Sequence, residues 1–262
     1  MTDDEVAGEL AEAAGRLLLD VRAAHAGAAD RERGDAGDAR SHAFLLAELG
    51  RLRPGDAVLS EEGLDDRARL TAERVWIVDP LDGTREFGEL DRSDWAVHVA
   101  LWTARDGLVA GAVALPALGL TLRTPSVPLG DRPPGPPRIV VSRTRPPALA
   151  EHVRERLGGE LVPMGSAGAK MSAVVRGEAD VYVHAGGQYE WDSAAPVAVA
   201  VAAGLHASRL DGSPPRYNRP DPRLPDLLVC RPELAEAVLA AVRGTSPRAG
   251  EEAEGRRGGR SA

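Results

Sequence analysis

The stretch Val78-Asp79-Pro80-Leu81-Asp82-Gly83-Thr84 places two carboxylates three residues apart and a hydroxyl two residues later. It continues the apolar residues 75–77, which together with Val78 predict a buried strand that Pro80 ends. Carboxylates at a strand end suit Mg²⁺, whereas Zn²⁺ would call for His or Cys ligands, and none is nearby. An ordinary surface turn is the alternative, because Asp, Pro and Gly are common in turns.

A second alternative is a phosphatase of the haloacid dehalogenase type, whose Asp-x-Asp-Gly-Thr loop looks similar. The first Asp of that loop is the nucleophile, and in this chain its position holds Pro80. An aspartyl-phosphate mechanism therefore has no obvious carrier. The sequence favours a water nucleophile instead.

Composition and length narrow the class of protein. The 262 residues can bury a large core, as one sizeable domain or as two packed subdomains. The net charge of −8 argues against a general nucleic-acid surface. Residues 1–5 are acidic where a signal peptide would be basic, and no apolar run approaches the roughly 20 residues of a membrane span. We therefore expect a cytoplasmic protein that binds neither nucleic acid nor membranes.

The N-terminal part, residues 1–123, reads as two helices followed by an antiparallel-like sheet. The first helix covers residues 5–24, and the second begins near Ala39 after a polar stretch, with Asp38 as its cap. The predicted strands of this part lie at residues 58–60, 75–78, 95–102, 108–115 and 118–123. Residues 124–137 hold six prolines and form a linker or an irregular loop.

The C-terminal part, residues 138–243, alternates strands and helices, which favours an α/β subdomain. Its predicted strands lie at residues 138–142, 161–164, 181–183, 207–209 and 227–230, and its helices at 147–157, 167–176, 193–203 and 233–242. The only cysteine, Cys230, excludes an intramolecular disulfide and is expected in the core. Residues 244–262 have little to bury and predict a disordered tail.

Two further acidic sites stand at the ends of predicted elements. Glu61 and Glu62 follow a short strand, and Asp192 lies where an alanine-rich helix starts. Each has an ordinary explanation, as solvated charge or as a helix N-cap. Combined with Asp79 and Asp82, however, Glu61 and Asp192 make four carboxylates, which are enough for two adjacent cations.

These motifs, taken in order, resemble those of the inositol monophosphatase-like superfamily of Mg²⁺-dependent, lithium-sensitive phosphatases. The matching pieces are Ser60-Glu61-Glu62, residues 76–84, Gly165-Ser166-Ala167 and residues 191–195. Within the superfamily the chain looks most like the CysQ-type 3′(2′),5′-bisphosphate nucleotidases, because of Glu190 before Trp191-Asp192, residues 165–170, and Asp211-Gly212-Ser213-Pro214 leading to Tyr217-Asn218. The resemblance covers about residues 5–243.

The resemblance implies a mixed α+β or α/β fold of two subdomains, the sugar-phosphatase fold layered α-β-α-β-α, with the metal site between them. It also implies two or more Mg²⁺ ions. Glu61, Asp79 and the Leu81 carbonyl would hold one ion, and Asp79, Asp82 and Asp192 the second. Family members often form homodimers, which the sequence neither supports nor excludes.

The resemblance further implies that Thr84 and an upstream Asp orient the attacking water. Many members carry Lys-x-Asp and then Thr-x-x-Asp at this point, whereas residues 31–38 of this chain read Arg-Glu-Arg-Gly-Asp-Ala-Gly-Asp. We choose Asp38 over Asp35, because Asp38 directly precedes the predicted helix and stands before Glu61 at about the family's separation. The missing lysine and threonine weaken the case for a third cation in this loop.

The substrate would be held by backbone and side-chain donors. If Gly83 and Thr84 open a helix, as the resemblance implies, their N–H groups would bind the phosphate. Four side chains are candidates for binding the second phosphate or the sugar of a nucleotide, and each could equally be a surface residue: Ser142, Arg143, Ser166 and Lys170. Lys170 is the only lysine among 32 basic residues.

The leading hypothesis is a small-molecule phosphatase that removes the 3′-phosphate of adenosine 3′,5′-bisphosphate in sulfate assimilation, with the sulfated nucleotide as a second candidate substrate. An inositol 1-phosphate or fructose 1,6-bisphosphate phosphatase is the first alternative, because the metal chemistry would be the same. A non-catalytic phosphate-binding regulator is the second alternative. The four carboxylates and Thr84 argue against it.

Overall fold

The computed structural model describes residues 1–244 and contains two mixed sheets. The first sheet has the strand order β1-β2-β3-β4-β5. Its strands are β1 (Ala57–Ser60), β2 (Arg74–Asp82), β3 (Ala96–Thr103), β4 (Gly107–Leu115) and β5 (Leu120–Arg123). The neighbours from β2 to β5 pair antiparallel, as expected, but β1 and β2 are parallel, so the ends of both strands lie at one edge of the sheet.

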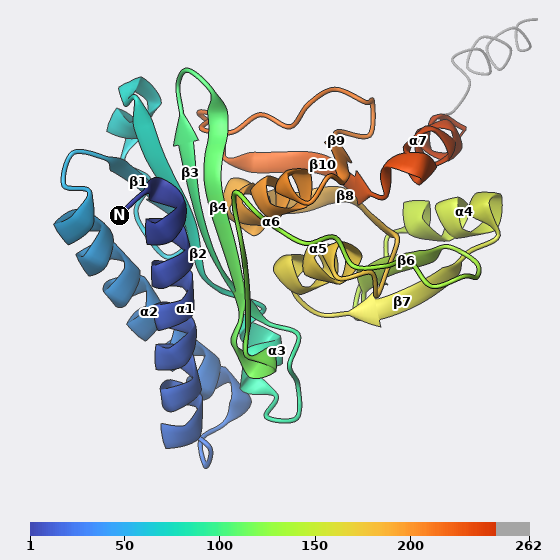
Figure 1. Cartoon of the computed structure of the whole chain (residues 1–262). Coiled ribbons are helices and arrows are strands. Elements are labelled where there is room, and N and C mark those ends of the chain that lie inside the picture. The colour runs from blue at the N-terminus through green and yellow to red at the C-terminus, as the bar shows by residue number, and fades with distance from the viewer. Residues whose placement is uncertain (245–262) are drawn as a thin grey trace, which may run out of the picture.

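Two long helices, α1 (Asp3–Ala24) and α2 (Asp30–Leu52), cover the outer face of this sheet (Figure 1). The apolar positions of α1 recur at helical spacing and are buried, among them Val6, Leu10 and Leu18. At its N-terminus the Thr2 hydroxyl accepts from Glu5 N, and Glu5 Oε2 accepts from Thr2 N, a capping box that fixes where the helix begins.

Helix α2 differs from the prediction of a polar stretch followed by a helix near Ala39. It runs unbroken from Asp30 to Leu52, so that Asp38 lies in its middle and caps nothing. The glycines that suggested an irregular stretch allow close packing instead. A Cβ on Gly34 would lie only 2.7 Å from Cγ2 of Thr84, so this helix can approach the end of β2 only with glycine there.

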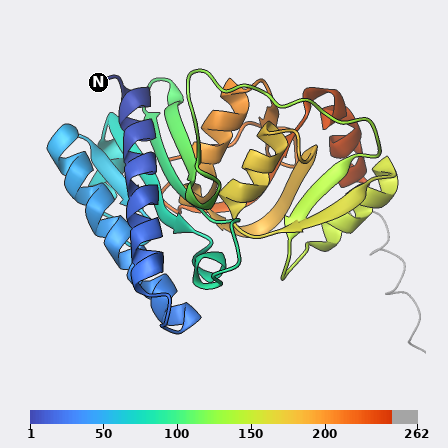
Figure 2. The same ribbon diagram turned by 60° about the horizontal axis from the view of Figure 1, so that its bottom comes forward.

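The second sheet has the strand order β7-β6-β8-β10-β9. Its strands are β6 (Arg138–Ser142), β7 (Glu160–Met164), β8 (Val181–Tyr189), β9 (His206–Ser208) and β10 (Arg223–Cys230). Helices α5 (Ala167–Val175) and α6 (Glu190–Ala202) lie between the two sheets, and α4 (Ala148–Leu157) and α7 (Ala235–Arg243) cover the far face, as the two views show (Figures 1 and 2). The layering α-β-α-β-α and the mixed fold class are confirmed.

Short segments complete the description. Residues 124–137 contain no helix or strand, which agrees with a linker or irregular loop, and Cys230 is buried as predicted. The strand predicted over residues 118–123 begins two residues later, at Leu120. Leu118 instead ends a short 3₁₀ turn that Pro116 opens, with its fixed φ and missing N–H. The remaining short helices are α3 (Thr84–Gly88) and 3₁₀ turns at Arg67–Thr71 and Pro232–Leu234.

Two predictions keep their status. The division into subdomains 1–123 and 138–243 stays a prediction, and the predicted disordered tail, beyond its first residue, lies outside the described residues. No helix in residues 1–244 combines the length and the apolar character that crossing a bilayer requires.

Candidate active site

An irregularity at the end of β2 brings Asp79 and Asp82 to the same side. Residues three apart in a regular strand face opposite ways. Here the pairing of β2 with β3 shifts register between Asp79 and Asp82, so both carboxylates turn toward the layer between the sheets. Leu81 N donates to Asp79 Oδ1 at 3.1 Å, which fixes the first of the two side chains.

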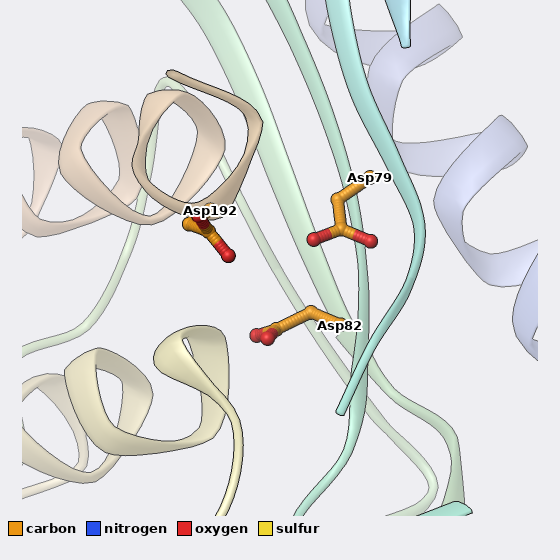
Figure 3. A group of neighbouring side chains, drawn as sticks. All are labelled: Asp79, Asp82 and Asp192. Carbon is orange, nitrogen blue, oxygen red and sulfur yellow. The ribbon is translucent and has the colours of Figure 1, made fainter. Parts of the chain in front are cut away.

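Asp192 supplies a third carboxylate from helix α6. The helix begins at Glu190, three residues earlier than predicted, so Asp192 is not the N-cap but lies in the first turn, where Oδ2 accepts from Tyr189 N at 2.6 Å. Oxygen atoms of Asp79, Asp82 and Asp192 lie within 4.8 Å of one another. Figure 3 shows the three side chains converging from the end of β2 and the start of α6.

Glu61 stands beside this group without being part of it. It follows β1, and its backbone N–H donates to Val78 O on the neighbouring strand. The residue is exposed, but the partly desolvated surroundings of its carboxyl group, with the charges of Asp192 and Asp82, raise the pKa of Glu61 to about 7. The same surroundings raise the pKa of Asp192 to about 6, through burial and the charge of Asp82.

Asp79 has the environment of a cation ligand. It is 1 % exposed, and burial together with the charges of Glu61 and Asp82 raises its pKa well above the usual range. Its Oδ2 atom has no hydrogen-bond partner among the residues of the described chain. An unpaired buried carboxylate oxygen facing other carboxylates is costly unless a cation joins them, so hard-cation binding fits this donor set.

Asp82 is held more firmly than Asp79. Its Oδ1 accepts from Ala167 N at 3.1 Å and its Oδ2 from Gly168 N at 2.5 Å, both at the start of α5. The imidazole Nε2 of His98, on β3, lies 3.2 Å from the same Oδ2. Burial opposes ionisation of Asp82, but the positive charge of His98 and the Gly168 N–H lower its pKa to about 2.

Asp38 and Thr84 meet next to the carboxylate group. Thr84 is the first residue of α3, and its hydroxyl donates to Asp38 Oδ1 at 3.2 Å and lies 3.4 Å from Leu81 O. Burial and the charge of Glu62 raise the pKa of Asp38 to about 7, against the hydrogen bond from Thr84. A carboxylate with a pKa near neutrality is suited to accept a proton from water.

Three of the four candidate substrate contacts line one pocket. Ser142, Ser166 and Lys170 lie there, in company with Arg85, Glu86, Thr144, Arg145 and Gly165. The Lys170 ammonium is buried and donates to the Gly165 and Ser166 carbonyls at 2.9 and 2.6 Å. The fourth candidate, Arg143, is engaged elsewhere, because its guanidinium donates to Glu86 and Glu89 at 2.7 Å each.

Sequence reasoning missed His98 and the two further arginines of the pocket, Arg85 and Arg145. The signal for His98 was present, since it is a single polar residue in the apolar run of β3. Nothing marked the two arginines, because they are two of many in an arginine-rich chain. Their place beside Lys170 follows only from the packing of α3 against the loop after β6.

Known proteins resemble this chain over nearly its whole length. A model of the inositol monophosphatase family matches residues 2–126 and 139–246. A protein of Mycobacterium leprae named 3′-phosphoadenosine 5′-phosphate phosphatase is 53 % identical over 255 residues, which are 93 % of this chain and 94 % of the relative. The 3′(2′),5′-bisphosphate nucleotidase CysQ of Escherichia coli is 30 % identical over 72 % of this chain and 81 % of its own.

The fold also matches solved structures. The crystal structure of CysQ from Bacteroides thetaiotaomicron, described as a bacterial member of the same family, superimposes with a TM-score of 0.74 at 28 % identity. The match covers 87 % of this chain and 97 % of that one. The family is metal-dependent, and the carboxylates at the ends of β2 and α6 form a group that could hold a metal ion.

Proposed function

The chain belongs to the inositol monophosphatase family, and on this basis we propose that it hydrolyses the 3′-phosphate of adenosine 3′,5′-bisphosphate. The observation that carries the proposal is the convergence of Asp79, Asp82 and Asp192 beside the Thr84–Asp38 pair. The names of the two phosphatase relatives support the choice of substrate. A role in sulfate assimilation, action on the sulfated nucleotide, and a cytoplasmic location are further parts of the proposal.

The cation in this proposal is Mg²⁺, two ions or more, held by oxygen ligands alone. The ligands would be Glu61, Asp79, Asp82, Asp192 and the Leu81 carbonyl. When bound, Mg²⁺ neutralises phosphoryl charge and lowers the pKa of water. The free Oδ2 of Asp79 and the raised pKa values of the neighbouring carboxyl groups are the features of this chain that favour such an occupant.

Asp38 and Thr84 would prepare the attacking water. The Thr84 hydroxyl already donates its proton to Asp38, so its lone pairs remain free to accept from a water molecule. Asp38, with its raised pKa, would take the proton that this water loses as it attacks phosphorus. No covalent phosphoenzyme is needed, in agreement with the proline at position 80.

The phosphate would lie against the turn that opens α3. Gly83 has a φ of 92°, and a Cβ there would lie 2.9 Å from the Cβ of Ser166. Glycine is therefore required where the turn before α3 approaches the start of α5. Backbone N–H groups of Gly83 and Thr84 are the proposed phosphate donors. Ser142, Ser166 and Lys170 line the adjoining pocket and are proposed to contact the rest of the nucleotide, whereas the ion pairs of Arg143 suit a structural role.

A phosphate-release assay over three substrates tests the proposal. With Mg²⁺ present, we expect the largest kcat/KM for adenosine 3′,5′-bisphosphate, ahead of inositol 1-phosphate and fructose 1,6-bisphosphate. The reverse order would favour one of the alternative phosphatases. Binding of the bisphosphate without any release would favour a regulator. Lithium inhibition and a homodimer stay predictions, which the same assay with added LiCl and sedimentation of the purified chain would check.

A further inference from the structure

His98 is completely buried between two segments that carry carboxylates of the active site. It lies in the central strand β3, and its side chain is inaccessible to solvent. Nδ1 lies 3.0 Å from the carbonyl oxygen of Trp191, the residue before Asp192. Because a carbonyl can only accept, Nδ1 carries a hydrogen and donates it.

The other ring nitrogen faces the carboxylate that comes from β2. Nε2 lies 3.2 Å from Oδ2 of Asp82, and neither this contact nor any other gives Nε2 a well-aligned hydrogen bond among residues 1–244. One imidazole therefore touches both the side chain of Asp82 and the backbone that leads into Asp192. Asp82 lies at the end of β2 and Asp192 lies in the first turn of α6. Their carboxylates repel each other when both are ionised.

Glycine at position 168 makes room for this ring. A Cβ on Gly168 would lie 2.0 Å from Nε2 of His98 and 3.1 Å from Oδ2 of Asp82, far closer than side-chain atoms allow. The missing side chain also lets the Gly168 N–H reach Asp82 at 2.5 Å. The imidazole and the first turn of α5 can contact the same carboxylate oxygen only because residue 168 is glycine.

We infer that His98 is a positioning residue that sets the spacing of Asp82 and Asp192 for cation binding, and that it works as a matched pair with Gly168. This inference rests on the metal site of the proposed function. Residues that orient ligand carboxylates or imidazoles typically change metal affinity by about 10- to 100-fold when replaced. A role in packing alone would change stability but not metal affinity.

Binding of Mn²⁺ in the absence of substrate tests the inference separately from activity. It is measured through the electron paramagnetic resonance signal of the free ion. We expect His98→Ala to weaken Mn²⁺ binding about 10-fold or more while circular dichroism shows a folded protein. Wild-type affinity in His98→Ala would overturn the inference. Failure of the wild-type chain itself to bind Mn²⁺ would instead overturn the proposed metal site.

The pairing with Gly168 is tested by a double-mutant cycle. Gly168→Ala should weaken Mn²⁺ binding in the wild-type background, because the methyl group displaces the imidazole. It should change affinity much less in the His98→Ala background, where the ring is gone and only the 3.1 Å approach to Oδ2 of Asp82 remains. Equal losses in both backgrounds would show that the two residues act independently and would contradict the matched pair.

Gly15→Ala provides the matched control. Gly15 is a buried glycine of α1, on the outer face of the first sheet, where a Cβ would lie 2.7 Å from Cγ of Pro116. We expect a lower melting temperature and unchanged Mn²⁺ affinity. An affinity loss as large as that of Gly168→Ala would mean that metal binding merely follows general stability, and the inference would fail.

Discussion

The hydroxyl of Thr84, at the start of α3, donates a hydrogen bond of 3.2 Å to Oδ1 of Asp38, in the middle of α2. The two residues are 46 positions apart in the chain. Helix α2 reaches the end of β2 through its glycine face, which brings a carboxylate with a pKa near neutrality beside the carboxylate group. Asp38 is therefore fixed by a long helix rather than by a flexible loop.

Asp38→Asn should lower kcat by about 100-fold or more, because the amide keeps an acceptor for Thr84 but cannot take a proton from water. Asp35→Asn is the control in the same helix. Its carboxylate is exposed and lies 3.8 Å from Arg31, so we expect a much smaller change. Steady-state kinetics of both variants decide between the residues, and a larger loss for Asp35→Asn would show that the wrong aspartate was chosen.

The difference in stability between wild type and Asp38→Asn should depend on pH in a defined direction. The native pKa of about 7 lies above the ordinary value of 3.8, so between these values the native state binds more protons than the unfolded state. The contribution of the Asp38 carboxyl group to the free energy of unfolding is fully present below pH 3.8 and is lost as pH rises through 7. Without divalent cations, the melting temperature of Asp38→Asn should therefore rise relative to wild type from about pH 4 to pH 7. A constant difference over that range would contradict the raised pKa.

Asp79→Asn and Asp82→Asn should both remove most turnover, by about 100-fold or more, but with opposite effects on stability. An amide at 79 can still accept from Leu81 N and removes a charge repelled by Glu61 and Asp82. An amide at 82 offers one acceptor where Ala167 N and Gly168 N need two, which costs about 1–3 kcal/mol.

Melting temperatures in chelator measure this contrast. We expect an equal or higher value for Asp79→Asn and a lower one for Asp82→Asn. Added Mg²⁺ should raise the wild-type melting temperature and raise that of Asp79→Asn less, since binding to the native state alone stabilises it. Equal destabilisation by both substitutions would mean that repulsion from the neighbouring carboxylates does not destabilise the protein at Asp79.

Lys170→Met should raise KM for the bisphosphate far more than it lowers kcat, because the cation lines the pocket beside the proposed reaction centre. Some stability should be lost too, since the ammonium donates to two carbonyls at the start of α5. Steady-state kinetics and melting temperatures of the same variant separate a role in substrate binding from a role in stability. A lower melting temperature with unchanged KM would leave the lysine with a structural role only.

Local sequence predicted the elements of this protein better than its site. The apolar run 75–78 predicted the buried strand, and the spacing of Val6, Leu10 and Val21 predicted helix α1, because both patterns express burial of side chains. The pattern failed for residues 30–38. Glycines that serve close packing in a helix look the same in the sequence as glycines that interrupt one.

The site depends on contacts between segments far apart in the chain, and these have no local signature. The resemblance to a family supplied the proposed ligand set, of which the structure brings Asp79, Asp82 and Asp192 together. The resemblance could not supply the contact of His98 with Asp82, which depends on the shifted register between β2 and β3. Nor could it supply the pairing of Arg143 with two glutamates. Such contacts follow from tertiary packing alone.

The identity of the nucleotide product tests the central claim most directly. Adenosine 3′,5′-bisphosphate incubated with the purified chain and Mg²⁺ should yield adenosine 5′-monophosphate and one equivalent of phosphate, as resolved by ³¹P nuclear magnetic resonance. The same incubation in excess chelator should yield neither product. Formation of adenosine 3′-monophosphate, or full phosphate release in chelator, would contradict a cation-dependent 3′-phosphatase built on Asp79, Asp82 and Asp192.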